Sequence, residues 1–173
     1  MNEKIALLGI VEIISSLSCG IAILFLTYKV MSVYGKKRLK MDQNNLAYNL
    51  LIAGVLFSVG YMVSGVIDPI LDSYRFLSST DISKSQLIFS FLSYGGLYIA
   101  ISYFCALVIV FLGLYIYSSL TSISELKELK ENNIGVAIVL IAIILTMSLM
   151  TSNGVILLIE AFIPYPEFPA KIG

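Results

Sequence analysis

The chain has 173 residues, of which 58% are hydrophobic and 13% are charged, and its formal net charge is zero. A soluble domain carries about 25% charged residues, so this chain has too few charges to cover a surface in water. The composition excludes an ordinary soluble globule, a disordered segment and a collagen-like fibre. The balanced charge gives no indication of a nucleic-acid partner. These features are typical of an integral membrane protein.

Four charge-poor windows follow one another along the chain. Residues 5–28 contain a single charge, Glu12, whereas residues 43–67, 85–124 and 132–159 contain none. Each window is long enough to cross about 30 Å of hydrocarbon, which takes roughly 20 apolar residues. Backbone polar groups in lipid must be paired within their own segment, so we expect helices. The predicted fold class is an all-α membrane protein with four transmembrane helices.

The first window is expected to be a retained helix and not a cleaved signal peptide. Glu12 interrupts its apolar run, and the window contains no A-x-A-like cleavage site. Glu12 is also the one acid expected within the hydrocarbon, about two turns into the helix. A carboxylate there requires either a function or a structural partner, and both interpretations stay open.

The next two helices have recognisable ends. The second is expected over 46–67, with Pro69 ending or kinking it just beyond Asp68. The third is expected to be one long helix, because its strong turn signal, Gly95-Gly96, lies too near the start of the window to separate two spans. Ser83 and Gln86 have the spacing of a capping box and predict where this helix begins.

The basic residues predict the orientation. Seven of the eleven lie in the segments that join the first helix to the second and the third to the fourth: Lys29, Lys36, Lys37, Arg38, Lys40, Lys127 and Lys130. The positive-inside rule places both segments in the cytoplasm and both termini outside. The first interpretation of four of these residues is a topology signal, and the alternative is a site for anionic lipid headgroups: Lys36, Lys37, Arg38 and Lys40. The mixed charges of 124–131 predict a helical extension.

The two halves of the chain carry a tandem pattern. Asn44-Asn45 precedes the second helix, and Asn132-Asn133 precedes the fourth, 88 residues later. Small, polar and acidic positions recur at this offset, which predicts two parallel helical-hairpin repeats. The paired asparagines are expected to be helix N-caps. The predicted domains are a first repeat at 1–80, a second at 81–163 and a proline-rich tail at 164–173.

These hairpins resemble a bacterial inner-membrane family that is catalogued as domain of unknown function 350. The likeness is carried by Asn44-Asn45-Leu46-Ala47 through Gly65 and by Asn132-Asn133-Ile134-Gly135 through Asn153. The resemblance implies a multi-pass protein of the bacterial inner membrane and brings no catalytic residue with it. It also implies a link to envelope stress, since members are sometimes encoded near proteins of the phage-shock type.

A stripe of small and polar residues on the second and fourth helices is the candidate functional surface. Its positions recur every fourth residue: Gly60, Ser64, Asp68 and Asp72 on the second helix, and Ser148, Ser152, Ile156 and Glu160 on the fourth. One interpretation is a packing seam between helices or subunits. The other is a hydroxyl-lined path that leads to acids at an outer mouth.

No catalytic, metal or cofactor site is predicted. The chain has no histidine, and two cysteines in apolar spans, Cys19 and Cys105, are expected to be buried thiols and not zinc ligands. Phosphate-loop, dinucleotide and nucleophile-elbow motifs do not occur in the sequence. We expect a non-enzymatic scaffold or sensor subunit whose partners are membrane lipids, its own copies and a cytoplasmic or envelope protein, with no nucleic acid. The alternative is a small oligomeric cation channel or transporter with an acidic outer mouth.

Overall fold

The computed structural model describes residues 3–39, 45–79, 83–120 and 125–161. Its elements are α1 (Glu3–Tyr34), a π-helical turn η1 (Gly35–Leu39), α2 (Leu46–Ser64), α3 (Ile67–Ser79), α4 (Lys84–Leu120), α5 (Glu125–Lys130) and α6 (Ile134–Glu160). Four stretches are long and apolar enough to cross a membrane: Ser16–Lys37, Leu46–Ser73, Ser85–Ser119 and Ile134–Glu160. The prediction of an all-α protein with four membrane spans is confirmed, and the chain is a multi-pass membrane protein.

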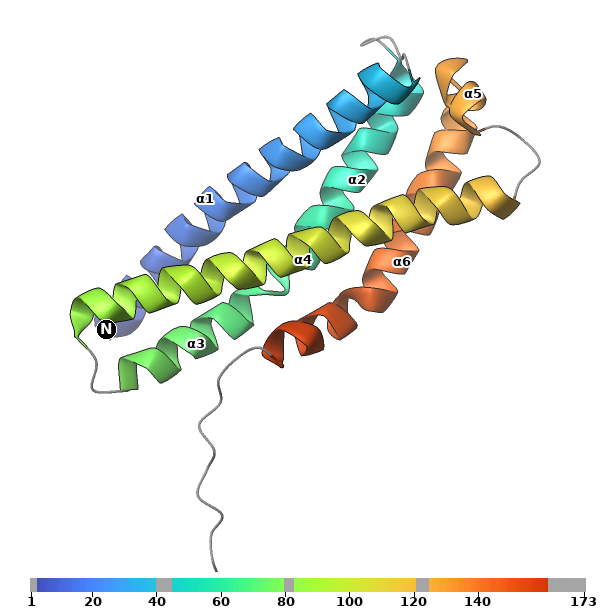
Figure 1. The fold of residues 1–173 in the computed structure, drawn as a ribbon. Helices are drawn as coiled ribbons and strands as arrows, with labels where there is room; N and C mark the ends of the chain where they lie inside the picture. The colour runs from blue at the N-terminus through green and yellow to red at the C-terminus, as the bar shows by residue number, and fades with distance from the viewer. Residues whose placement is uncertain (1–2, 40–44, 80–82, 121–124, 162–173) are drawn as a thin grey trace, which may run out of the picture.

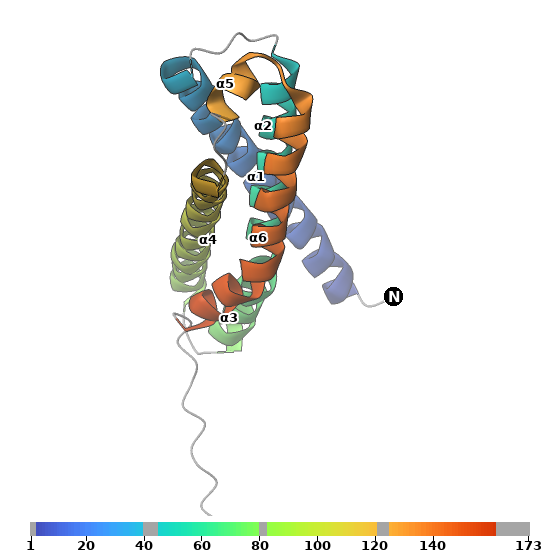
Figure 2. The ribbon, with the colours of Figure 1, turned by 90° about the vertical axis from the view of Figure 1, so that its right-hand side faces the viewer.

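The core lies where α2, α4 and α6 meet. Figure 1 shows α4 running obliquely across α2 and α6, and all three pairs of helices are in contact. Val55 and Val59 of α2, Val110 of α4 and Ile144 of α6 are fully buried there. α1 packs mainly against α2, and its N-terminal half diverges from the other helices (Figure 2). The bundle therefore has a tight three-helix centre and a more loosely attached first helix.

α2 and α6 lie side by side and run in the same direction. Near their beginnings, a Cβ atom added to Gly54 would lie 2.6 Å from Cγ1 of Ile141. Near the end of α2, a Cβ atom added to Gly65 would lie 3.0 Å from Cδ1 of Ile156. Such close approach depends on small residues, as is common between membrane helices. Two tandem hairpins would place their second helices side by side and parallel, which is the arrangement of α2 and α6. The repeat itself remains a prediction.

The long third helix is confirmed as a single element. α4 has 37 residues and contains Gly95 and Gly96 within its helical run. Its capping box is formed, because the Ser83 backbone N–H donates to Oε1 of Gln86 (3.3 Å) and the Gln86 N–H donates to Oγ of Ser83 (3.4 Å). At 1.5 Å per residue the helix is about 55 Å long. It must tilt or extend beyond a hydrocarbon layer of about 30 Å.

The predicted end of the second helix was three residues too late. α2 ends at Ser64, and helical structure resumes at Ile67 and continues to Ser79, so Pro69 lies inside α3. The break still follows from Pro69, because a proline lacks the N–H that would bond the carbonyl four residues earlier and its ring crowds that carbonyl. That carbonyl belongs to Gly65, where the chain bends. Pro69 is tolerated inside α3 because it lies in the first turn, where backbone N–H groups have no acceptor within the helix.

Two connecting segments also differ from expectation. Lys29 was placed in a loop but lies inside α1, because the apolar run continues through Val30 and Val33 and a long lysine side chain can extend its charge toward water. The mixed-charge segment is not an extension of the third helix. It forms a separate short helix, α5, after α4 ends at Leu120.

Candidate functional site

Both predicted asparagine caps are confirmed. Oδ1 of Asn45 accepts a hydrogen bond from the Tyr48 backbone N–H (2.8 Å) at the start of α2. Oδ1 of Asn133 accepts one from the Val136 N–H (3.3 Å) at the start of α6. Each side chain thus pairs one of the unpaired donors in a helical first turn.

The same asparagine pairs also join the two halves of the chain. Nδ2 of Asn45 donates to the Leu129 carbonyl at 2.6 Å and to the Lys130 carbonyl at 3.3 Å. In return, Oδ1 of Asn132 accepts from the Ala47 N–H at 2.9 Å. We call this exchange the asparagine clasp. It links the start of α2 to the turn between α5 and α6, and sequence reasoning missed it because the partners are more than 80 residues apart.

Three of the four α2 and α3 members of the predicted stripe are exposed. Ser64 is exposed and donates to the Tyr61 carbonyl of its own helix (2.7 Å). Asp68 and Asp72 are exposed on α3. Gly60 is partly buried and lies next to α1, since a Cβ atom there would meet Leu24 at 3.9 Å.

The α6 members face inward. Ser148 is 1% exposed and Ser152 is 8% exposed, while Glu160, the last residue of α6, is half-buried. Ser152 donates to the Leu149 carbonyl of its own helix (3.1 Å). Among the described residues, Oγ of Ser148 has no hydrogen-bond partner, and neither does Oγ of the fully buried Ser58 on α2. The two halves of the stripe therefore do not line one cavity.

The remaining predicted positions lie at the margins of the described structure. Lys36 and Lys37 are exposed in the turn η1, and Arg38 lies in the same turn. Glu12 lies within α1. The side chains of Glu12 and Arg38, together with Lys40 and the tail at 164–173, lie outside what the structure describes.

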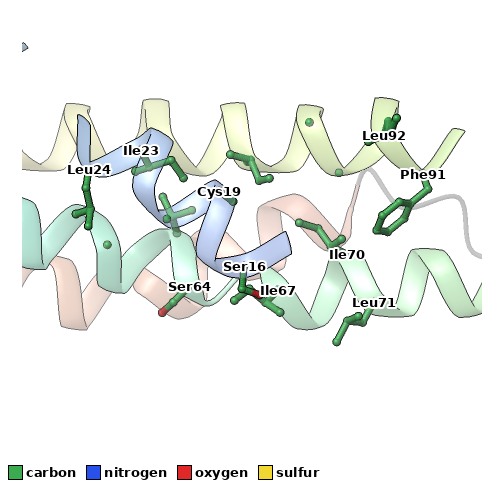
Figure 3. A pocket seen from close by; sticks show the side chains of 16 residues that line it. Ser16, Cys19, Ile23, Leu24, Ser64, Ile67, Ile70, Leu71, Phe91 and Leu92 are labelled. Atoms are coloured by element: carbon green, nitrogen blue, oxygen red, sulfur yellow. The ribbon is translucent and has the colours of Figure 1, made fainter. Parts of the chain in front are cut away.

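One cavity among the described residues lies between α1, α2, α3 and α4 and has a volume of 390 Å³. Its wall is mainly apolar, and Figure 3 shows Phe91 extending from α4 toward α3, which carries Ile70 and Leu71. Cys19 also lies in this wall, and both Cys19 and Cys105 are partly buried and pack against the core. We call this cavity the α1–α4 pocket.

Four glycines belong to the wall of the α1–α4 pocket: Gly20, Gly60, Gly95 and Gly96. A Cβ atom built on Gly20 or Gly96 would meet nothing within 4 Å. These glycines therefore leave a smooth, open surface between α1 and α4. Such a surface can receive an apolar helix or chain at close range.

The chemistry of the α1–α4 pocket is that of apolar binding. Its described wall contains no charged side chain, and its hydroxyls come from Ser16 and Ser64. Sequence reasoning found Gly60 and Ser64 by their spacing but missed the contributions of Gly20, Gly95 and Gly96. Those three glycines lie on helices whose relative placement the sequence does not specify.

The family described as Domain of Unknown Function (DUF350) matches residues 91–163. This confirms the resemblance seen in the sequence. The match lies within the second predicted repeat and covers α4 from Phe91 onward, α5 and α6. No curated protein and no solved structure matches the chain.

Proposed function

We propose, with the DUF350 match over 91–163 as the premise, that this chain is a non-enzymatic, oligomeric scaffold or sensor subunit of the bacterial inner membrane. Its copies associate through the α1–α4 pocket, and the assembly works with a cytoplasmic or envelope protein. The observation that carries the proposal is the glycine-lined, uncharged wall of that pocket.

The shape of the pocket favours a helix as its occupant. Small residues on a membrane helix let a neighbouring backbone approach closely, which increases van der Waals contact where lipid gives no hydrophobic driving force. Gly96 is exposed and has open space where a side chain would be, so the described residues leave this surface uncovered. A second copy of the chain supplies apolar helices with the required character.

The burial of the polar core favours a scaffold over a conductor within one chain. Ser58 is 0% exposed and Ser148 is 1% exposed, so solvent does not reach either hydroxyl in this state. A path for ions needs polar groups that water can reach. The hydroxyls between α2, α4 and α6 do not meet that condition.

Filling the pocket tests the proposal. Gly96→Leu places a large side chain in the pocket, whereas Gly154→Leu places the same side chain on an exposed part of α6 that also has nothing within 4 Å. We expect Gly96→Leu to convert the oligomer to monomers in detergent, as measured by light scattering, while Gly154→Leu leaves the mass unchanged. Identical masses for both variants and the unaltered chain would refute the pocket as the contact.

The alternative, a cation channel, retains one supporting observation. Asp68 and Asp72 are both exposed on α3, and an oligomer would bring several copies of them together. In that case, neutralising Glu12, Asp68, Asp72 and Glu160 together would lower cation flux through reconstituted vesicles. Flux equal to that of empty vesicles before any substitution removes this alternative.

A further inference from the structure

A second groove lies along the C-terminal half of α1, with Phe111 of α4 in its wall, and shares no residue with the α1–α4 pocket. It has a volume of 520 Å³, and its wall consists of Leu26, Lys29, Val30, Val33, Tyr34, Lys37 and Phe111. We propose that this groove binds one anionic phospholipid, with the headgroup at the two lysines and an acyl chain along the apolar wall.

The charge of the groove supports this ligand. Lys29 and Lys37 are both exposed and belong to the same groove wall, although they are eight residues apart. Among the described residues of that wall, none is acidic, so no carboxylate of the wall neutralises the two ammonium groups. Lys37 is the last residue of the first apolar span and Lys29 lies about two turns before it, so each lysine extends its charge toward an anionic headgroup along its apolar stem.

The apolar part of the groove fits an acyl chain. Leu26 and Val33 are 48% and 44% exposed and form an open wall on α1. On the other side, the rings of Tyr34 and Phe111 meet edge to face with centroids 5.6 Å apart, which closes the space between α1 and α4. From Leu26 to Lys37 the groove extends about 16 Å along α1.

This site differs from the basic segment that the sequence indicated. Its defining residue is Lys29, which the sequence placed in a loop and the structure places on the helix beside an apolar groove. A diffuse basic surface would attract any anion with a strength set by the charge of the anion alone. A groove with two lysines selects a molecule that has both a phosphate and a chain.

The test compares lipid retention in nanodiscs that contain equal amounts of phosphatidylglycerol and phosphatidylcholine. Lipids that remain bound after release of the protein are counted by native mass spectrometry. We expect the unaltered chain to retain phosphatidylglycerol preferentially, and Lys29→Gln with Lys37→Gln to reduce that preference by about fivefold for each lysine. The matched control, Lys127→Gln with Lys130→Gln, removes the same charge from α5 and is expected to keep the preference.

Three results would overturn the proposal. The first is equal retention of the two lipids by the unaltered chain. The second is an equal loss in the groove variant and the α5 variant, which would indicate a diffuse field. The third is complete displacement of the lipid by soluble glycerol phosphate, which has the headgroup charge and no acyl chain. Unchanged melting temperatures of both variants establish that the comparison concerns binding and not folding.

Discussion

Asn45 and Asn132 hold the start of α2 against the turn that follows α5. Asn45 donates through Nδ2 to the Leu129 carbonyl, and Asn132 accepts through Oδ1 from the Ala47 N–H. Asn132 also adopts a φ of 63°, the left-handed conformation that asparagine tolerates better than most residues. Both asparagines therefore complete a helix end and connect it to the other half of the chain.

Substitutions at Asn45 separate capping from cross-linking. Asn45→Ala removes both and is expected to lower the free energy of unfolding by about 2 kcal/mol, since a cap and a hydrogen bond each contribute about 1 kcal/mol. Asn45→Ser keeps a capping oxygen but is too short to reach Leu129, so about half of that loss is expected. Denaturation in detergent micelles measures both. Asn133→Ser, at the exposed cap of α6, is the control and should cost less, because it keeps a capping oxygen and loses only the exposed bond from Nδ2 to Oε2 of Glu128 (2.7 Å). Equal values for all three variants would contradict the clasp.

Substitutions at Asn132 separate conformation from hydrogen bonding. Asn132→Gly keeps the left-handed φ without strain and loses only the bond from Ala47, so a loss of about 1 kcal/mol is expected. Asn132→Ala loses the same bond and adds about 1–2 kcal/mol for the left-handed conformation. The unfolding free energies should therefore fall in the order asparagine, glycine, alanine. A glycine variant less stable than the alanine variant is the result that this explanation does not allow.

Gly54 determines how closely α2 and α6 approach. Gly54→Val places a branched side chain against Ile141, whose Cβ lies 3.2 Å from the Cβ position at Gly54. Overpacking of this kind costs about 1–3 kcal/mol. Gly154→Val, which meets nothing within 4 Å, is the control and should cost nothing measurable. Adding Ile141→Ala to Gly54→Val should recover part of the loss, and a strictly additive double variant would argue against direct contact.

Removing the unpaired hydroxyls of Ser58 and Ser148 tests whether they only fill the core, as in a scaffold, or have partners in the membrane, as in a channel. If they only fill the core, Ser58→Ala and Ser148→Ala should leave stability unchanged or slightly raised, because a buried hydroxyl without a partner contributes no bond. Ser102→Ala, by contrast, loses a bond to the Met62 carbonyl (3.3 Å) and should cost about 1 kcal/mol. Thermal unfolding in detergent checks all three variants. A large loss at Ser58 or Ser148 would mean that these hydroxyls have partners in the membrane.

The sequence was informative wherever the relevant physics is local. Charge-poor windows predicted the four spans because lipid disfavours charge over a fixed thickness. The Ser83–Gln86 spacing predicted the start of α4, and the asparagines predicted two caps, because a cap contacts its own first turn. Pro69 was recognised as a source of a break, but the break lies four residues earlier, at Gly65, where the proline ring acts.

What the sequence could not predict depends on how distant helices meet. Spacing by four residues placed Ser64 and Ser152 on equivalent faces, yet one faces outward and the other inward, because α1 and α4 cover α2 and α6 differently. The sequence placed Lys29 in a loop, whereas in the structure α1 continues past it and Lys29 shares a groove wall with Phe111. The glycines of the α1–α4 pocket likewise line one cavity only because of how α1 and α4 are placed relative to each other.

The most direct test of the central claim, association of copies through the α1–α4 pocket, is an electron-spin distance measurement between copies. The spin label is attached at position 119 of α4, which is exposed and lies outside the pocket wall, in a chain that carries Ser119→Cys, Cys19→Ser and Cys105→Ser. We predict a defined intermolecular distance in membranes that disappears when Gly96→Leu is added and persists when Gly154→Leu is added. A sample with no intermolecular distance, or one in which Gly96→Leu leaves that distance intact, would contradict the account.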